Sequence, residues 1–408
     1  MKVVKRKYMS NEFIPYSRQS IDQSDIEAVI EVLKSDWMTQ GPKISEFEER
    51  LASRVDAEYA IALATGTAAL HCACFAADVQ PGDEIITSPI TFAASGNCAL
   101  YLGATVKFID IKRDTYCLDA EQLEAAITSK TKAIIPVDYT GQPCDMDEIN
   151  NIAQKHGVTV IEDAAHAIGA RYKNKSVGSL TDMSIFSFHP VKHVAMGEGG
   201  LITTNNKNFA DKLRLFRTHG ITNSDAAMLN RELSRDRHIK GKSALNNDDK
   251  APWYYEMHEL GFNYRITDIQ CALGISQLNK LDSFLERRQE IAERYTKAFS
   301  ESSYIITPFQ EPDRQNAWHL YMLRLNLDKM EKTRKTVFNE LRAQGIGVHV
   351  HYIPLHLQPY YQKNLGYKYG DFPEAEAFYN AALTIPLYPA MTDKDVERVI
   401  ETILDIIY

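Results

Sequence analysis

Apolar residues near the start of the chain recur at the spacing of an α-helix. The stripe comprises Ile26, Val29, Ile30 and Leu33, which share one helical face. Asp22, followed three residues later by Asp25, is typical of a capped helix start. A polar loop follows at residues 35–41, and Pro42 opens a second amphipathic pattern. These patterns predict two helices before the first long strand.

From residue 59 onward, short apolar runs alternate with helical patterns. The runs predict strands at residues 60–64, 84–87, 105–111, 133–138, 158–162, 184–188 and 201–204. Strands that alternate with helices are typical of βαβ units. We therefore expect an α/β fold with a mainly parallel, doubly wound central sheet.

A polar stretch at residues 222–250 interrupts this alternation and predicts a long loop or insertion. A long helical pattern then begins at Thr267 and leads into a smaller C-terminal α+β domain. There we expect strands at 319–325 and 348–353 and helices at 332–343 and 393–407. The predicted division is residues 1–266 for the N-terminal segment and large domain, and 267–408 for the linking helix and small domain.

Composition narrows the classes of function. The 408 residues carry a formal net charge of −8, and no basic stripe indicates nucleic-acid binding. Six cysteines lack zinc-site spacing and are expected to be reduced and packed. No apolar segment follows the charged residues at 1–7 as a signal peptide would require, and none reaches the length of a membrane span. We expect a cytoplasmic protein that does not bind membranes.

Several motifs lie where predicted strands end, which is where open parallel sheets bind ligands. Residues 64–70 run from a strand into a helix, with Gly66 and Thr67 at the junction. Free N–H groups at such a helix start favour a phosphate, although a simply capped helix is the alternative. Phe92 follows another strand and could stack on a flat ring or pack in the core.

Two charged residues follow strands in the same way. Asp163 ends an apolar run, where a buried carboxylate needs a cation such as a protonated pyridine; a helix-capping role is the alternative. Lys192 follows the strand at 184–188, five residues after Ser187 and shortly before the glycines of 197–200. A lysine that forms a Schiff base must be partly desolvated, whereas a single lysine is usually exposed.

The order of these motifs resembles the DegT/StrS-type sugar aminotransferases, which have the type I aminotransferase fold and use pyridoxal 5′-phosphate. The resemblance runs from about Ile14 to the C-terminus. It rests on the segments TGTAAL, PITFAAS, EDAAHAIGA, SFHPVK, GEGG and GFNYRITDIQCALG.

The resemblance implies a role for each matching residue. Lys192 would hold the cofactor as a Schiff base and act as general base and acid, and Asp163 would pair with the pyridine nitrogen. The implied cofactor contacts are Gly66, Thr67, Phe92, Asp163, His166, Ser187, Lys192 and Asn263. Asn263 would reach the site of a neighbouring subunit, so the resemblance implies a homodimer with shared active sites.

Further segments, at 15–17, 33–41, 318–321 and 350–354, are similar to the family members of pseudaminic acid biosynthesis. This closer resemblance implies substrate contacts by Tyr16, Asp36, Trp37, Met38, Thr39, Trp318, His319, Leu320 and Tyr321. The implied reaction converts a UDP-linked 4-keto-6-deoxy-N-acetylhexosamine to its 4-amino sugar, with glutamate as amino donor. The polar stretch before Asp249 is longer than the resemblance leads us to expect.

Other functions stay open. The enzyme could aminate another nucleotide sugar, of the GDP-perosamine or UDP-D-sugar type. A sugar 3-dehydratase of the same fold carries histidine where Lys192 stands, and a non-enzymatic regulator would need a DNA-reading module that is not visible. His349 and His351 share a strand face, but no acidic or cysteine ligand lies near them, so packing or substrate contact is favoured over a metal.

Overall fold

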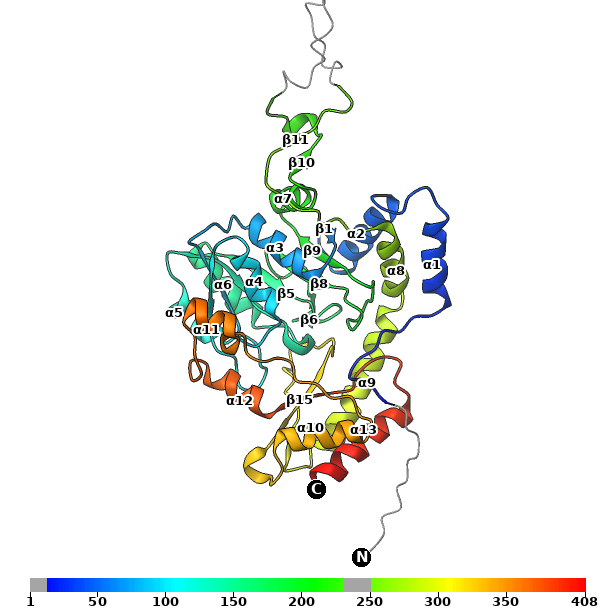
Figure 1. The fold of residues 1–408 in the computed structure, drawn as a ribbon, viewed down its shortest axis with the longest axis vertical. Helices are drawn as coiled ribbons and strands as arrows, with labels where there is room; N and C mark the ends of the chain where they lie inside the picture. Colours follow the sequence, from blue (N-terminus) through cyan, green and yellow to red (C-terminus); the bar gives the residue numbers. More distant parts are fainter. Residues whose placement is uncertain (1–12, 231–250) are drawn as a thin grey trace, which may run out of the picture.

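The structure is a computed structural model that describes residues 13–230 and 251–408. Its centre is a seven-stranded sheet with the order β1-β9-β8-β5-β4-β2-β3 (Figure 1). In that order the strands are Tyr59–Leu63, Gly200–Thr204, Met183–Ser187, Thr159–Asp163, Thr131–Ile135, Glu84–Thr87 and Thr105–Phe108. Strands β3, β2, β4, β5 and β8 pair in parallel, whereas β9 is antiparallel to β8 and β1. The expectation of an α/β fold with a mainly parallel sheet is confirmed.

Helices cover both faces of this sheet. Strand β1 contributes to the cores on both faces. Its Ile61 and Leu63 pack with α3 (Gly66–Ala76) and α4 (Ala93–Leu100) on one face. Its Ala60 and Ala62 pack with α2 (Pro42–Arg54) and α8 (Asp268–Leu278) on the other. Successive strand residues face opposite sides, so a strand buried on both faces is apolar throughout. The remaining helices of this part are α1 (Gln23–Leu33), α5 (Leu123–Ala126), α6 (Met146–His156) and α7 (Lys207–Arg217).

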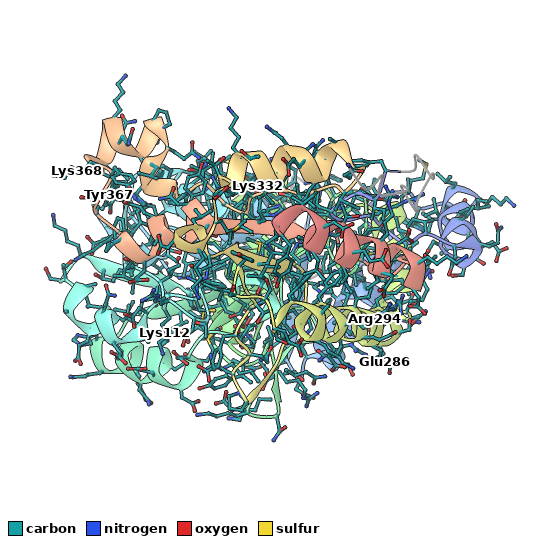
Figure 2. The ribbon with its side chains drawn as sticks, turned by 90° about the horizontal axis from the view of Figure 1, so that it is seen from below. Lys112, Glu286, Arg294, Lys332, Tyr367 and Lys368 are labelled. Carbon is teal, nitrogen blue, oxygen red and sulfur yellow. The ribbon has the colours of Figure 1, made fainter. Side chains whose placement is uncertain are left out.

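A separate hydrophobic core lies in the C-terminal part. It joins α9 (Leu281–Phe299), α10 (Arg334–Ala343) and α13 (Asp393–Ile407) to a small sheet of β12 (Ile305–Ile306), β14 (Tyr321–Leu325) and β15 (Ala382–Ile385). Figure 2 shows this part from below, with Glu286 and Arg294 beside α9. Helices α11 (Pro359–Leu365) and α12 (Pro373–Ala381) pack instead in the main core, through Tyr361, Ala375 and Phe378. The domain boundary between residues 266 and 267 stays a prediction.

Short strands lie outside these two sheets. β6 (Arg171–Tyr172) pairs with β7 (Lys175–Ser176) and β13 (Arg314–Gln315). β10 (Ile221–Thr222) pairs with β11 (Glu256–Met257) beyond α7, where Figure 1 shows them projecting from the main body. The predicted polar insertion at 222–250 begins in this region, and its residues 231–250 lie outside the described chain. Short 3₁₀ turns occupy Ala120–Gln122, Tyr139–Gly141, Asp225–Ala227, Leu327–Lys329 and Leu355–Leu357.

Some predicted elements differ in the structure. The helix expected from Thr267 ends at Leu278, and α9 starts separately at Leu281. The strand expected at 348–353 is irregular, with a single bridge between His349 and Thr384. The apolar stripe of α1 leaves Ile26 46% exposed, although the predicted capping box of Asp22 and Asp25 is present. The start of α1 could therefore be predicted from nearby residues, whereas the burial of its apolar face could not.

All six cysteines are buried and free, as expected. In the described parts of the chain, none of the helices is long and apolar enough to cross a membrane.

Candidate functional site

A cavity of about 600 Å³ opens at the carboxyl ends of β5 and β8. It brings together residues from distant parts of the sequence, as expected for an open parallel sheet. Its lining includes Tyr16, Thr65, Gly66, Thr67, Phe92, Ser95, Asp163, His166, Ser187, Lys192, His351 and Tyr352. Seven of the eight residues expected to contact the cofactor therefore line one cavity.

One corner of the cavity is suited to a phosphate. Gly66 and Thr67 begin α3, and the hydroxyl of the N-cap residue Thr65 accepts a hydrogen bond from the Ala68 amide. The amides of the first helical turn have no partner within the helix and attract an anion. A Cβ on Gly66 would lie 3.0 Å from Cβ of Ser187, so glycine is needed where these two segments meet.

Asp163 lies at the end of β5 and is only 5% exposed. Its Oδ2 accepts a 2.6 Å hydrogen bond from Ser95 Oγ, and its Oδ1 accepts one of 3.2 Å from the Ala165 amide. Burial raises the pKa of the carboxyl, while Ser95, Ala165 and the charge of Lys192 oppose the rise. The site therefore holds a carboxylate that a buried cation would stabilise.

Lys192 lies in the loop after β8, where its amide bonds the carbonyl of His189. Its Nζ is 3.4 Å from Nε2 of His319. Burial lowers the pKa of the amine to about 7, with Asp163 opposing the shift and Arg288 adding to it. Near neutral pH a large fraction of this lysine is thus uncharged, which is the form that attacks a carbonyl or accepts a proton.

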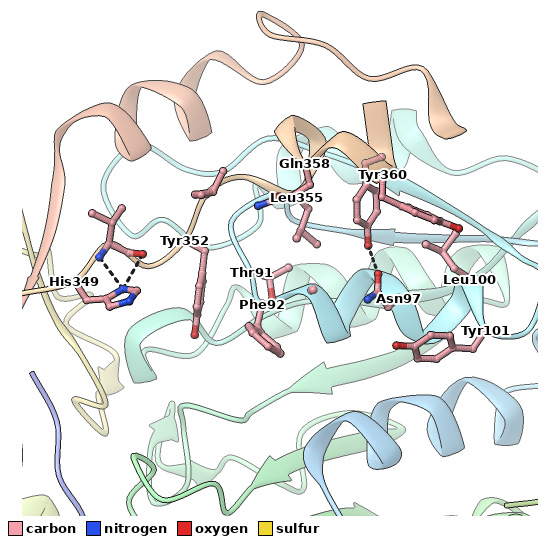
Figure 3. Close-up of a pocket in the computed structure, with 14 residues that line it drawn as sticks. Thr91, Phe92, Asn97, Leu100, Tyr101, His349, Tyr352, Leu355, Gln358 and Tyr360 are labelled. Carbon is pink, nitrogen blue, oxygen red and sulfur yellow. Dashed lines mark hydrogen bonds between the residues drawn. The ribbon is translucent and has the colours of Figure 1, made fainter. Parts of the chain in front are cut away.

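Aromatic side chains form another wall of the cavity. Phe92 lies just before α4, and its ring centroid is 6.0 Å from that of Tyr352. The hydroxyl of Tyr352 lies 3.4 Å from Nε2 of His166, and burial holds the pKa of His166 well below its usual value. Figure 3 shows Phe92 and Tyr352 facing a neighbouring cavity of about 640 Å³ that also contains Thr91 and Tyr360. Phe92 is 60% exposed, so one of its faces is free to contact a ring.

The residues expected to contact substrate are only partly assembled in the single chain. Tyr16 lines the cavity, with its ring 5.2 Å from that of His351, and His319 contacts Lys192. Trp318 instead donates to Gln289 through Nε1, and the hydroxyl of Tyr321 bonds that of Thr296. Their neighbour Leu320 packs in the main hydrophobic core.

In the single chain the side chains of Trp318, Leu320 and Tyr321 pack in the two hydrophobic cores. Their contacts with substrate stay a prediction. Asp36, Trp37, Met38 and Thr39 are exposed and do not line the cavity. Asn263 is also exposed, paired with Thr218 in a single bridge. None of these five residues lines the cavity of the single chain, so their contacts stay a prediction.

Sequence reasoning missed Ser95 and Tyr352. Ser95 lies three residues after Phe92, on the same side of a helix turn, which was a usable signal. Tyr352 is brought to the site by an irregular segment that carries no periodic pattern. His351 was considered as a metal ligand with His349; its Nδ1 lies 2.7 Å from Oγ1 of Thr384.

Comparison with known proteins agrees with this geometry. Residues 19–404 match the DegT/DnrJ/EryC1/StrS aminotransferase family. The chain belongs to this family and is a pyridoxal-phosphate-dependent nucleotide-sugar aminotransferase with the type I fold.

Two curated relatives are similar along nearly their whole length. The spore coat polysaccharide biosynthesis protein SpsC of Bacillus subtilis is 44% identical over 97% of this chain and 98% of its own. The UDP-4-amino-4,6-dideoxy-N-acetyl-beta-L-altrosamine transaminase of Campylobacter jejuni is 40% identical over 97% of each chain.

Two solved structures have the same fold. Helicobacter pylori PseC, an aminotransferase involved in the biosynthesis of pseudoaminic acid, superimposes with a TM-score of 0.86 at 29% identity, over 97% of this chain and 99% of its own. The putative sugar aminotransferase Spr1654 of Streptococcus pneumoniae in its pyridoxal phosphate form gives 0.85 at 32% identity, over 97% and 98%.

Proposed function

We propose that the enzyme transfers an amino group from glutamate to C4 of a UDP-linked 4-keto-6-deoxy-N-acetylhexosamine, as a step of pseudaminic acid biosynthesis. The observation that carries this proposal is the 40% identity to the altrosamine transaminase over 97% of both chains. Of the residues that we expected from the pseudaminic acid members, Tyr16 lines the cofactor cavity and His319 lies 3.4 Å from Nζ of Lys192.

The residues of the cavity fit pyridoxal phosphate. Asp163 offers a buried carboxylate for the pyridine nitrogen, the start of α3 with Ser187 offers donors for the phosphate, and Phe92 offers a ring face. When bound, the cofactor accepts the electrons released at the α-carbon of the donor. Lys192, whose pKa is lowered to about 7, is the residue we assign to hold it.

In this proposal the residues of the cavity divide the work between them. Nζ of Lys192 holds the cofactor and, once the donor has released it, takes the proton from the donor α-carbon. The carboxylate of Asp163 keeps a proton on the pyridine nitrogen, and Ser95 orients that carboxylate. His166, kept neutral by burial, is available to donate or accept a hydrogen bond without adding charge.

Borohydride reduction tests the assignment of Lys192. The holoenzyme is expected to be yellow, and peptide mass spectrometry after reduction should find a pyridoxyl group on Lys192. Lys192→Ala should abolish the adduct, whereas Lys207→Ala, on the exposed surface of α7, should leave it unchanged. A pyridoxyl group on a different lysine contradicts the assignment.

We further propose that the enzyme is a homodimer whose Asn263 serves the site of the partner. Its exposure, and that of residues 36–39, in the single chain supports this proposal. Mixing the Lys192→Ala variant with an impaired Asn263→Ala variant should restore activity, because some sites then combine two intact halves. Subunit exchange without any recovered activity would reject a shared site.

The substrate is tested by kcat/KM with glutamate as donor. We expect preference for UDP-2-acetamido-2,6-dideoxy-β-L-arabino-hexos-4-ulose over its D-xylo epimer, because misdirected polar groups leave hydrogen-bonding partners unpaired. Transfer to another nucleotide sugar is the second candidate, favoured by the 44% identity to SpsC of Bacillus subtilis. A ratio near one, or preference for a GDP- or dTDP-linked sugar, selects that candidate.

A further inference from the structure

The buried face of α9 contains one charged side chain. Its buried residues follow a helical stripe: Leu281, Phe284, Arg288, Ile291, Ala292, Tyr295 and Phe299. Arg288 is only 1% exposed, whereas its neighbour Arg287 contacts Glu290 and Asp393 at the surface. A charge in such a core position is unfavourable unless it is well hydrogen-bonded.

Backbone carbonyls, rather than a carboxylate, surround this guanidinium. Nη1 of Arg288 donates to the carbonyls of Trp318, His319 and Leu387 at 3.1, 3.2 and 3.0 Å. Within residues 13–230 and 251–408, no acidic side chain lies in salt-bridge contact with it. Its full positive charge therefore acts on the surroundings.

Two of the three carbonyls belong to the turn that presents His319 to Lys192. Trp318 in this turn has a φ of +50°, a left-handed conformation that is unfavourable for a bulky residue. The His319 amide donates to the carbonyl of Thr140 at 2.8 Å, and its ring nitrogen Nε2 lies 3.4 Å from Nζ of Lys192. Arg288 and the carbonyl of Thr140 thus both hold this turn.

The charge of Arg288 also acts on the amine. Burial is the largest cause of the lowered pKa of Lys192, His193 and His319, and the charge of Arg288 adds to it in all three. The titratable and charged groups around Lys192 are Asp163, His166, His193, His319, His351 and Arg288. Arg288 is the cation of this group at neutral pH, because burial lowers the pKa of its guanidinium only to about 9.

We propose that Arg288 is a positioning residue for the amine of Lys192: it fixes the Trp318–His319 turn beside Nζ and, as an unpaired buried charge, favours the neutral amine. This inference rests on the proposed role of Lys192. If it is correct, α9 affects the reaction through Lys192.

The test measures acylation of Lys192 against pH by peptide mass spectrometry. The full-length enzyme is used in its pyridoxamine phosphate form, in which Lys192 is free. Arg288→Gln removes the charge and keeps an N–H donor, Arg288→Lys keeps the charge and loses the planar group, and Arg287→Gln is the control that removes a surface charge from the same helix.

Arg288→Gln should raise the pH midpoint of Lys192 acylation by roughly one unit, because the removed charge no longer disfavours the protonated amine. Arg287→Gln should leave it unchanged. An unchanged midpoint in Arg288→Gln, or an equal rise in both variants, overturns the electrostatic part of the inference.

Arg288→Lys tests the positioning part, and also serves if Arg288→Gln does not fold. It should keep the midpoint but lower kcat about tenfold with KM within twofold, because the turn is no longer held. Wild-type kcat in this variant overturns positioning. A pyridoxyl group found on another lysine would instead reject the proposed function, so the two failures are distinguishable.

Discussion

Ser95→Ala is the substitution that most directly tests how Asp163 is kept ionised. Ser95 Oγ lies 2.6 Å from Oδ2 of Asp163 and 2.7 Å from Oγ1 of Thr91. Since a hydroxyl has one proton, Ser95 donates to the carboxylate and accepts from Thr91. The substitution removes one hydrogen bond from a buried carboxylate and leaves the Thr91 hydroxyl without its partner.

The magnitude follows from the charge of the acceptor. A hydrogen bond to an ionised group contributes roughly 1.5–3 kcal/mol, and each 1.36 kcal/mol changes a rate tenfold. If the whole contribution is lost in the transition state, kcat falls roughly 10- to 150-fold. The pKa of Asp163, already raised by burial, rises further because the bond from Ser95 had opposed that rise.

Stopped-flow absorbance of the half-reaction with glutamate measures this loss, with cofactor content determined in parallel. Cys98→Ala is the matched control, because it also removes one buried heavy atom from α4 but its thiol bonds a backbone carbonyl. Ser95→Ala activity within twofold of wild type, at full cofactor occupancy, would refute the reasoning. An equal loss in Cys98→Ala would attribute the effect to packing.

Three further predictions concern the same cavity. Asp163→Ala should lower kcat by roughly two to four powers of ten, because breaking a buried ion pair costs about 3–5 kcal/mol; steady-state kinetics measure this. Lys192→Met should raise the melting temperature of the cofactor-free enzyme at pH 6. The folded state lowers the amine pKa to about 7 from an ordinary 10.5, so the gain is complete below pH 7 and disappears by about pH 10.5; calorimetry at several pH values checks the trend. Gly66→Ala should weaken cofactor binding about tenfold, since its Cβ would lie 3.0 Å from Cβ of Ser187, and an absorbance titration measures it.

Much of the fold could be predicted because it depends on local patterns. The alternation of apolar strands and helices predicted all seven strands of the central sheet, and the Asp22 capping box depends on residues three apart. The break between α8 and α9 could not be predicted, because Leu278 and Leu281 on either side of it keep the three-residue spacing of one helical stripe.

The site divides in the same way. Gly66, Asp163, Ser187 and Lys192 each follow a strand, so the topology of the sheet is enough to bring them together. Tyr321 also lies at a strand, yet its side chain points into the C-terminal core. Which side of a strand faces the cavity depends on packing between two cores, and one sequence does not specify it.

The burial of all six native cysteines has a practical consequence. A thiol reagent that reacts with accessible thiolates should find little to modify in the folded enzyme. A single cysteine introduced on an exposed residue, such as Glu286 on α9, could then carry a fluorophore or spin label without removing any native residue. Distances between labelled copies of the chain would then test the proposed homodimer in solution.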